Sequence, residues 1–128
     1  MLDNPDSDHI EVRVISEYVP GQSNSDANRY VFAYHVSIEN RGTIPAQLLS
    51  RHWIITDGNQ KVQEVKGEGV IGEQPTIMPG ETYQYSSGTV LQTPVGSMQG
   101  SYSMIDATGA EFNANIPVFT LAFPRALH

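Results

Sequence analysis

Residues Arg29–Asn40, RYVFAYHVSIEN, carry the clearest strand pattern in the chain. Apolar side chains occupy every second position and smaller or polar ones occupy the positions between, which is the period of a β-strand with one buried face. The apolar set is Tyr30, Phe32, Tyr34, Val36 and Ile38. The pattern predicts a strand here whose aromatic face packs in the core.

Six further segments with strand character lie on either side of this one. They are residues 9–19, 48–56, 61–66, 81–87, 99–106 and 111–123. Residues that favour turns separate them, among them Pro20–Asn28, Asp57-Gly58 and Thr108-Gly109. Asp-Gly between two strand segments predicts a hairpin, because both residues tolerate the positive φ of a tight turn. No apolar spacing of helical period extends beyond one turn.

Seven short strands at this spacing predict an all-β fold, an antiparallel seven-stranded β-sandwich of fibronectin III or immunoglobulin shape, with a small barrel as the alternative. Trp53 is central in its strand and is expected in the core. Pro117 cannot donate to a sheet ladder, so the last strand is predicted at a sheet edge or at a switch between sheets. An edge strand leaves pairing with a second copy of the chain open, and the oligomeric state is not predicted.

Composition limits both the architecture and the partners. The 128 residues fit one domain, predicted over 9–128, after an acidic and disordered amino-terminal segment, 1–8. Seven Lys and Arg against 14 Asp and Glu give a net charge of -7, the wrong sign for nucleic acid or an acidic membrane surface. Neither a signal peptide nor an apolar span for membrane insertion is expected. The chain has no cysteine, which favours the reducing cytoplasm.

The stretch Val65–Pro75 interrupts the strand pattern and carries glycines at G-x-G-x-x-G spacing, at Gly67, Gly69 and Gly72. A dinucleotide fingerprint needs a helix after the glycines, and the prolines and glycine that follow argue against one. Two interpretations remain open. The loop could form an anion-binding concavity with Lys66, Lys61 or Arg51 near it, or it could be a connection between sheets whose glycines meet special φ angles.

Metal and catalytic sites are not predicted. The histidines are His9, His35, His52 and His128, and none are spaced as a ligand pair. His35 and His52 could meet across neighbouring strands of one sheet, which is more often a surface arrangement. The serines lack a G-x-S-x-G nucleophile motif. We therefore expect no catalytic residues, no metal ligands and no cofactor, and predict that the chain is not an enzyme.

Four stretches closely resemble the bacterial ApaG family, also called CorD. They are residues 48–58, 65–75, 79–88 and 96–102, and the similarity leaves out only the first eight residues. The resemblance implies a fibronectin III-like sandwich and links to cobalt and magnesium efflux and to diadenosine tetraphosphate metabolism. Related domains in eukaryotic proteins are suspected of binding proteins. The glycines match family positions, but a motif on a different fold inherits no nucleotide chemistry.

The preferred hypothesis is a non-catalytic binding module that engages an unidentified protein partner. Its contact loop is predicted to comprise Gly67, Glu68, Gly69, Val70, Ile71 and Gly72, with Val70 and Ile71 at the apex. The alternative is a module that binds a polyphosphate or a divalent cation at the same loop, with Lys66 and Arg51 as possible anion contacts. Glu68 and Glu73 disfavour it, because they would repel a phosphate.

Overall fold

A computed structural model describes residues 9–124, so the predicted disordered segment 1–8 and His128 lie outside the described residues. Within that range the chain forms eight strands and two short 3₁₀ helices. The strands are β1 (Ile10–Tyr18), β2 (Tyr30–Asn40), β3 (Ala46–Asp57), β4 (Val62–Glu68), β5 (Thr76–Ile77), β6 (Thr82–Leu91), β7 (Val95–Asp106) and β8 (Glu111–Ala122). The helices η2 (Pro20–Gln22) and η3 (Ser25–Ala27) lie between β1 and β2.

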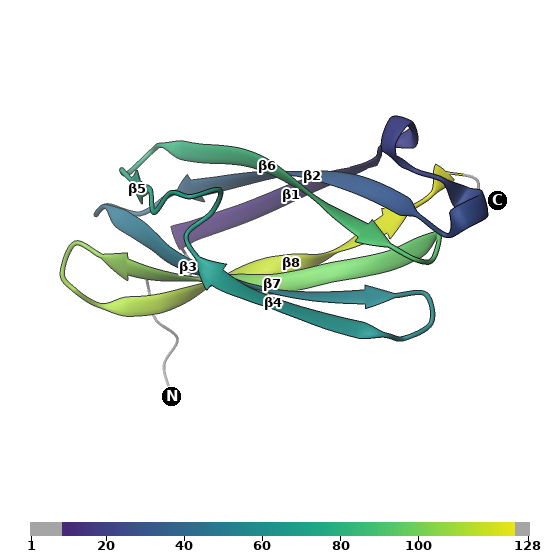
Figure 1. Cartoon of the computed structure of the whole chain (residues 1–128). Helices are drawn as coiled ribbons and strands as arrows, with labels where there is room; N and C mark the ends of the chain where they lie inside the picture. The colour runs from purple at the N-terminus through teal and green to yellow at the C-terminus, as the bar shows by residue number, and fades with distance from the viewer. Residues whose placement is uncertain (1–8, 125–128) are drawn as a thin grey trace.

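Two antiparallel sheets face each other (Figure 1). The first has the order β1-β2-β6, and the second has the order β4-β3-β7-β8, with β5 paired to the first two residues of β3. The all-β sandwich is therefore confirmed. No helix among residues 9–124 is long and apolar enough to cross a membrane.

Each of the seven predicted strands is present, but the count of seven is wrong by one. The addition is β5, a two-residue strand that pairs with Ala46 and Gln47 of β3. It is too short to produce an alternating pattern. In addition, β7 begins at Val95 rather than Gln99. After Val95 it continues with glycine, serine and methionine, which do not form an alternating pattern.

The core is the predicted aromatic face of β2 together with the inner faces of the other strands. Tyr30, Phe32, Tyr34, Val36 and Ile38 are all buried. Trp53 is 2% exposed, which confirms its predicted place in the core. Its ring lies edge-on to those of Tyr34 on β2 and Phe119 on β8, so one indole joins the two sheets.

A buried hydrogen bond also joins the sheets. The hydroxyl of Tyr85 on β6 meets that of Tyr102 on β7, and burial raises the pKa of both phenols. Both therefore stay protonated at neutral pH, and one donates to the other. The bond links β6 to β7 across the core.

Two local predictions can be compared with the backbone. Pro117 lies on β8, which is a sheet edge, and the β7–β8 register shifts beside it, as expected for a residue that cannot donate to a ladder. The β3–β4 hairpin is present, but its positive φ is at Gln60 and not at Asp57 or Gly58. The Asp57 carboxylate instead accepts hydrogen bonds from the N–H groups of Asn59 and Lys61, which widens the turn.

Candidate functional site

The glycine loop, residues Gly67–Gln74, begins with the last two residues of β4, Gly67 and Glu68, and then leaves the edge of the sheet. The strands on either side of it, β4 and β5, both pair with β3, so the chain leaves and then resumes the same position beside that strand. A strand follows the glycines, and a dinucleotide-binding loop needs a helix there. The loop therefore lacks the helix dipole that would attract a phosphate.

A tight turn forms the tip of the loop. Val70 and Glu73 exchange two backbone hydrogen bonds of 2.8 and 2.9 Å. Ile71 and Gly72 between them have φ values of 43° and 79°, which is the pattern of a type I′ turn. Gly69 also has a positive φ, and a Cβ there would lie 2.2 Å from the carbonyl oxygen of Glu73. Only glycine fits at position 69.

The two apolar residues of the loop have opposite environments. Val70 is fully buried in the core, whereas Ile71 is 61% exposed. This corrects the expectation that both stand at the apex, because a hairpin turns successive side chains to opposite faces. Only Ile71 is available to a partner.

Arg51 on β3 holds the base of the loop. Its Nη1 donates hydrogen bonds to the carbonyl oxygens of Glu68 (3.1 Å) and Gly69 (2.9 Å). The guanidinium lies over Gly67, where a Cβ would approach Nη2 to 2.8 Å. The first glycine of the motif therefore makes room for an arginine. The predicted anion contact at Arg51 is already used for carbonyl oxygens within the chain.

Further bonds tie the loop to both sheets. The register of β3 against β7 shifts at Leu49, and the Leu49 carbonyl accepts from Gly69 N and Gln74 Nε2, each at 2.8 Å. From the opposite sheet, the Tyr83 hydroxyl donates to Glu73 at 2.9 Å. Hydrogen bonds from both sheets thus fix the position of the loop. The other predicted anion contact, Lys66, is exposed on β4 and makes no ion pair with any residue in 9–124.

His35 and His52 do not meet, because β2 and β3 belong to different sheets. His52 Nε2 lies 2.5 Å from Glu64 Oε2, and this hydrogen bond is the main cause that lowers the pKa of Glu64. No group of three or more His, Asp or Glu side chains in the described part of the chain is arranged to hold a metal ion.

The structure brings together one constellation that the sequence analysis missed. His35 Nδ1 lies 2.6 Å from the Ser86 hydroxyl, and His35 Nε2 lies 3.2 Å from Glu17 on β1. Such a chain resembles a serine, histidine and acid triad. However, all three side chains lie on an exposed sheet face where water solvates each group, whereas acyl transfer needs preorganised donors in a site that excludes water. Three residues on separate strands leave no spacing signal that could have found it.

Comparisons with known proteins agree on one family. The family model of the ApaG domain matches residues 20–106. The chain is 64% identical over 119 residues to Protein ApaG of Aromatoleum aromaticum, covering 93% of this chain and 94% of that one. It is 60% identical over 124 residues to Protein ApaG of Pseudomonas aeruginosa, covering 96% and 98%.

Solved structures give the same picture. The putative ApaA protein from Bordetella pertussis superposes with a TM-score of 0.89 at 52% identity, over 91% of this chain and 94% of that one. A protein from Archaeoglobus fulgidus matches with a TM-score of 0.52 at 12% identity, over 87% and 91%. The second similarity concerns the fold alone.

Proposed function

The chain belongs to the ApaG family, and we propose that it is a non-catalytic module that binds a protein partner through the turn at the tip of the glycine loop. We propose a cytoplasmic location, in keeping with the lack of cysteine. The family resemblance points to cobalt and magnesium efflux and to diadenosine tetraphosphate metabolism. The module would act in these processes by contacting another protein.

The observation that carries this proposal is the exposure of the Ile71 side chain on a rigid turn. A large apolar side chain, 61% exposed, stands on a turn whose neighbours are fixed by backbone bonds and by Arg51. A side chain on a rigid support loses little conformational entropy when a partner buries it. A loop that only connected strands would need no exposed isoleucine at a strained φ of 43°.

The same geometry disfavours the polyphosphate alternative. A phosphate-binding loop needs backbone N–H groups directed outward. Here the N–H groups of Gly69, Val70 and Glu73 donate to carbonyl oxygens within the protein. Glu68 and Glu73 add negative charge within the loop, and Arg51 binds carbonyl oxygens. The loop therefore offers a phosphate few donors and a repulsive field.

Affinity capture from cells tests the proposal with a matched pair of variants. Ile71→Asp places a charge on the turn. Ile15→Asp makes the same change on β1, where the isoleucine is 72% exposed. We expect a partner that the wild type and Ile15→Asp both retain and that Ile71→Asp loses. Urea denaturation of both variants checks that they fold. A partner that Ile71→Asp retains at the wild-type level would refute the proposed surface.

A further inference from the structure

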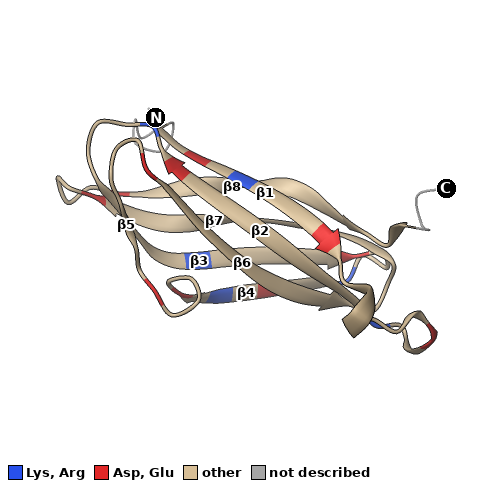
Figure 2. Ribbon diagram, turned by 90° about the horizontal axis from the view of Figure 1, so that it is seen from above, with Lys and Arg blue, Asp and Glu red and all other residues tan. Residues whose placement is uncertain are grey.

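The two sheets are unequal, and this leaves one position in the sandwich without a strand. Three strands, β1, β2 and β6, face the four long strands β4, β3, β7 and β8. At one side β1 lies beside β8, where the Ser16 hydroxyl donates to the Thr120 carbonyl and Tyr18 contacts Phe123. At the other side β4 extends beyond β6 (Figure 2). The inner face of β4 therefore has no strand opposite it.

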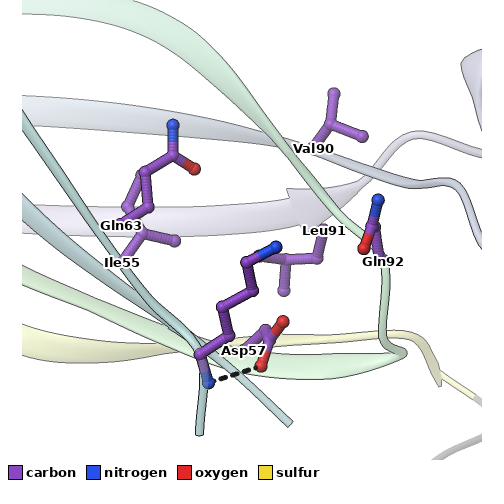
Figure 3. A pocket seen from close by; sticks show the side chains of 7 residues that line it. Ile55, Asp57, Gln63, Val90, Leu91 and Gln92 are labelled. Carbon is purple, nitrogen blue, oxygen red and sulfur yellow. Dashed lines mark hydrogen bonds between the residues drawn. The ribbon is translucent and has the colours of Figure 1, made fainter. Parts of the chain in front are cut away.

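A groove runs along this open side. It consists of two adjoining hollows of about 180 and 290 Å³, which share Ile55 and Gln63. Core residues such as Tyr34, Trp53 and Leu91 form its floor. Figure 3 shows the end nearest the β3–β4 hairpin, where side chains from β3 and β4 face those of β6. Arg51, which holds the glycine loop, lines the opposite end.

Several polar side chains line the walls of the groove without a hydrogen-bond partner in the described residues. Five of its side chains make no hydrogen bond or ion pair with any residue between 9 and 124; they are Lys61, Gln63, Ser87, Thr89 and Gln92. An inner-face polar side chain in a closed sandwich would need a partner. Such a row of donors and acceptors above an apolar floor suits a ligand that carries both polar and apolar groups.

The backbone of β6 offers a second set of unpaired groups. Asn40 N–H donates to the Glu81 carbonyl, and hydrogen-bonded pairs alternate along an antiparallel ladder. Odd-numbered residues of β6 therefore bond to β2. The even-numbered residues Gln84, Ser86, Gly88 and Val90 direct their N–H and C=O groups toward the open edge. This strand is a template for one more strand.

The free edge of β6 lacks the features that usually prevent unwanted pairing. Exposed edges commonly carry charges or proline. Among the other outer strands, β8 contains Pro117, β1 contains Glu11, Arg13 and Glu17, and β4 contains Glu64, Lys66 and Glu68. In contrast, Thr82–Leu91 has no charged residue and no proline. In Figure 2 β6 is accordingly free of red and blue.

We propose that an extended peptide segment of a partner protein adds to the β1-β2-β6 sheet as a fourth strand beside β6, with alternate side chains in the groove. This inference rests on the proposed protein-binding function and specifies its partner as an extended segment with an acidic residue. Main-chain bonds to β6 supply affinity, and the groove selects side chains. Arg51 at one end of the groove bonds to the loop that carries Ile71, so the groove adjoins the proposed contact turn.

Charge complementarity decides between a peptide and a second copy of this chain. Lys61 lies in the groove without an ion pair in the described residues, and Asp57 in the same groove accepts from backbone N–H groups. An inward carboxylate of the added strand would pair with Lys61. Strand β6 of a second copy has no carboxylate to offer. A partner segment with Asp or Glu at an inward position complements the groove.

Selection from a displayed library of random linear peptides provides the probe, and a selected peptide is then titrated into variants. Val90→Pro removes one outward N–H without removing a ladder bond, and Val90→Ala is its control. We expect Val90→Pro to weaken binding by about tenfold or more and Val90→Ala by less than about twofold. Bound peptide should slow hydrogen exchange at the amides of Ser86, Gly88 and Val90, whereas Ser87 and Thr89 should change little.

Lys61→Glu is a second variant that leaves the β6 backbone intact, and it should weaken binding of selected acidic peptides, more so at low salt. Equal affinity for the wild type, Val90→Pro and Lys61→Glu would overturn the strand-addition proposal. If Ile71→Asp alone abolished that binding, the proposed function would stand without the groove. Failure to select any peptide, together with no captured partner, would count against both. If the protein formed a dimer that Val90→Pro dissociated, the β6 edge would bind a second copy of the chain, and the peptide proposal would be overturned.

Discussion

Arg51 donates a 2.9 Å hydrogen bond to the carbonyl oxygen of Gly69, across a gap of 18 residues in sequence. The bond joins the central part of β3 to the middle glycine of the G-x-G-x-x-G stretch. It reverses the chemistry that the motif suggests, because the cation binds carbonyl oxygens of the loop and not a phosphate. Gly67 thus leaves space for the Arg51 guanidinium, and Gly72 adopts the positive φ of a type I′ turn.

Replacing Arg51 by alanine should loosen the loop. The change removes a charged donor from two carbonyl oxygens, so we expect a loss of about 1 to 2 kcal/mol in the free energy of unfolding, at the low end for a partly exposed group. Lys66→Ala on the neighbouring strand should stay within about 0.5 kcal/mol. Urea denaturation measures both, and hydrogen exchange at Gly69 and Val70 should quicken only in Arg51→Ala. Equal losses in the two variants would contradict this role.

Alanine at Gly69 and at Gly72 should have different costs. At Gly69 the new Cβ would lie 2.2 Å from a backbone oxygen, whereas at Gly72 nothing lies within 4 Å. Both positions have a positive φ, so Gly72→Ala should cost about 1 kcal/mol and Gly69→Ala about 2 to 4 kcal/mol. Thermal or urea unfolding of the pair checks the difference. The same small cost at both sites would mean that the turn rearranges easily.

Trp53→Ala should cost about 3 to 5 kcal/mol, as large-to-small changes in a core do. The indole N–H of Trp53 has no hydrogen-bond partner in the described structure, so Trp53→Phe sacrifices packing but no bond. We expect the phenylalanine variant to lose about 1 to 2 kcal/mol. Denaturation in urea gives both values. A loss below about 1 kcal/mol for Trp53→Ala would place the indole outside the tightly packed core.

The sandwich could be predicted because the alternation along β2 shows which of its faces is buried and because the apolar run around Trp53 indicates a core strand. The edge position of β8 followed from Pro117 for a local reason, the missing N–H. These are properties of single strands, and a strand's own residues carry them. The two-residue strand β5 is the opposite case, since its pairing depends on where β3 begins and not on its own pattern.

The site was harder to predict, because its geometry depends on contacts between distant residues. The sequence marks Gly67 as part of a motif but cannot show that Arg51 fills the space above it. Nothing in the stretch Val70-Ile71 tells which residue is buried, since that depends on the turn type. The Ser86, His35 and Glu17 chain crosses three strands, so its members meet only after the sheet has formed.

Stability should fall in acid partly through Asp106. The Thr108 hydroxyl and the N–H groups of Thr108 and Ala110 bond to its carboxylate and lower its pKa. The unfolded chain then binds more protons, so this contribution is complete above about pH 3.9 and is lost as pH falls through the lower folded pKa. Urea denaturation near neutral pH and near pH 3 measures the free energy of unfolding at each pH. The difference between the two values should be smaller in Asp106→Asn than in the wild type, whereas Asp26→Asn should leave it unchanged. If the free energy of unfolding changed with pH by the same amount in Asp106→Asn and in the wild type, this assignment would be refuted.

The most direct test of the protein-contact turn is a parallel titration of isotope-labelled protein with the captured partner and with diadenosine tetraphosphate, following the amide signals of Gly69, Ile71 and Gly72. Only Ile71 and Gly72 occupy the exposed tip, and the donors that a phosphate needs are mostly engaged. We predict saturable shifts at Ile71 and Gly72 with the partner and none at micromolar nucleotide. Saturable shifts with micromolar diadenosine tetraphosphate, and none with the partner, would contradict the account and restore a phosphate-binding loop.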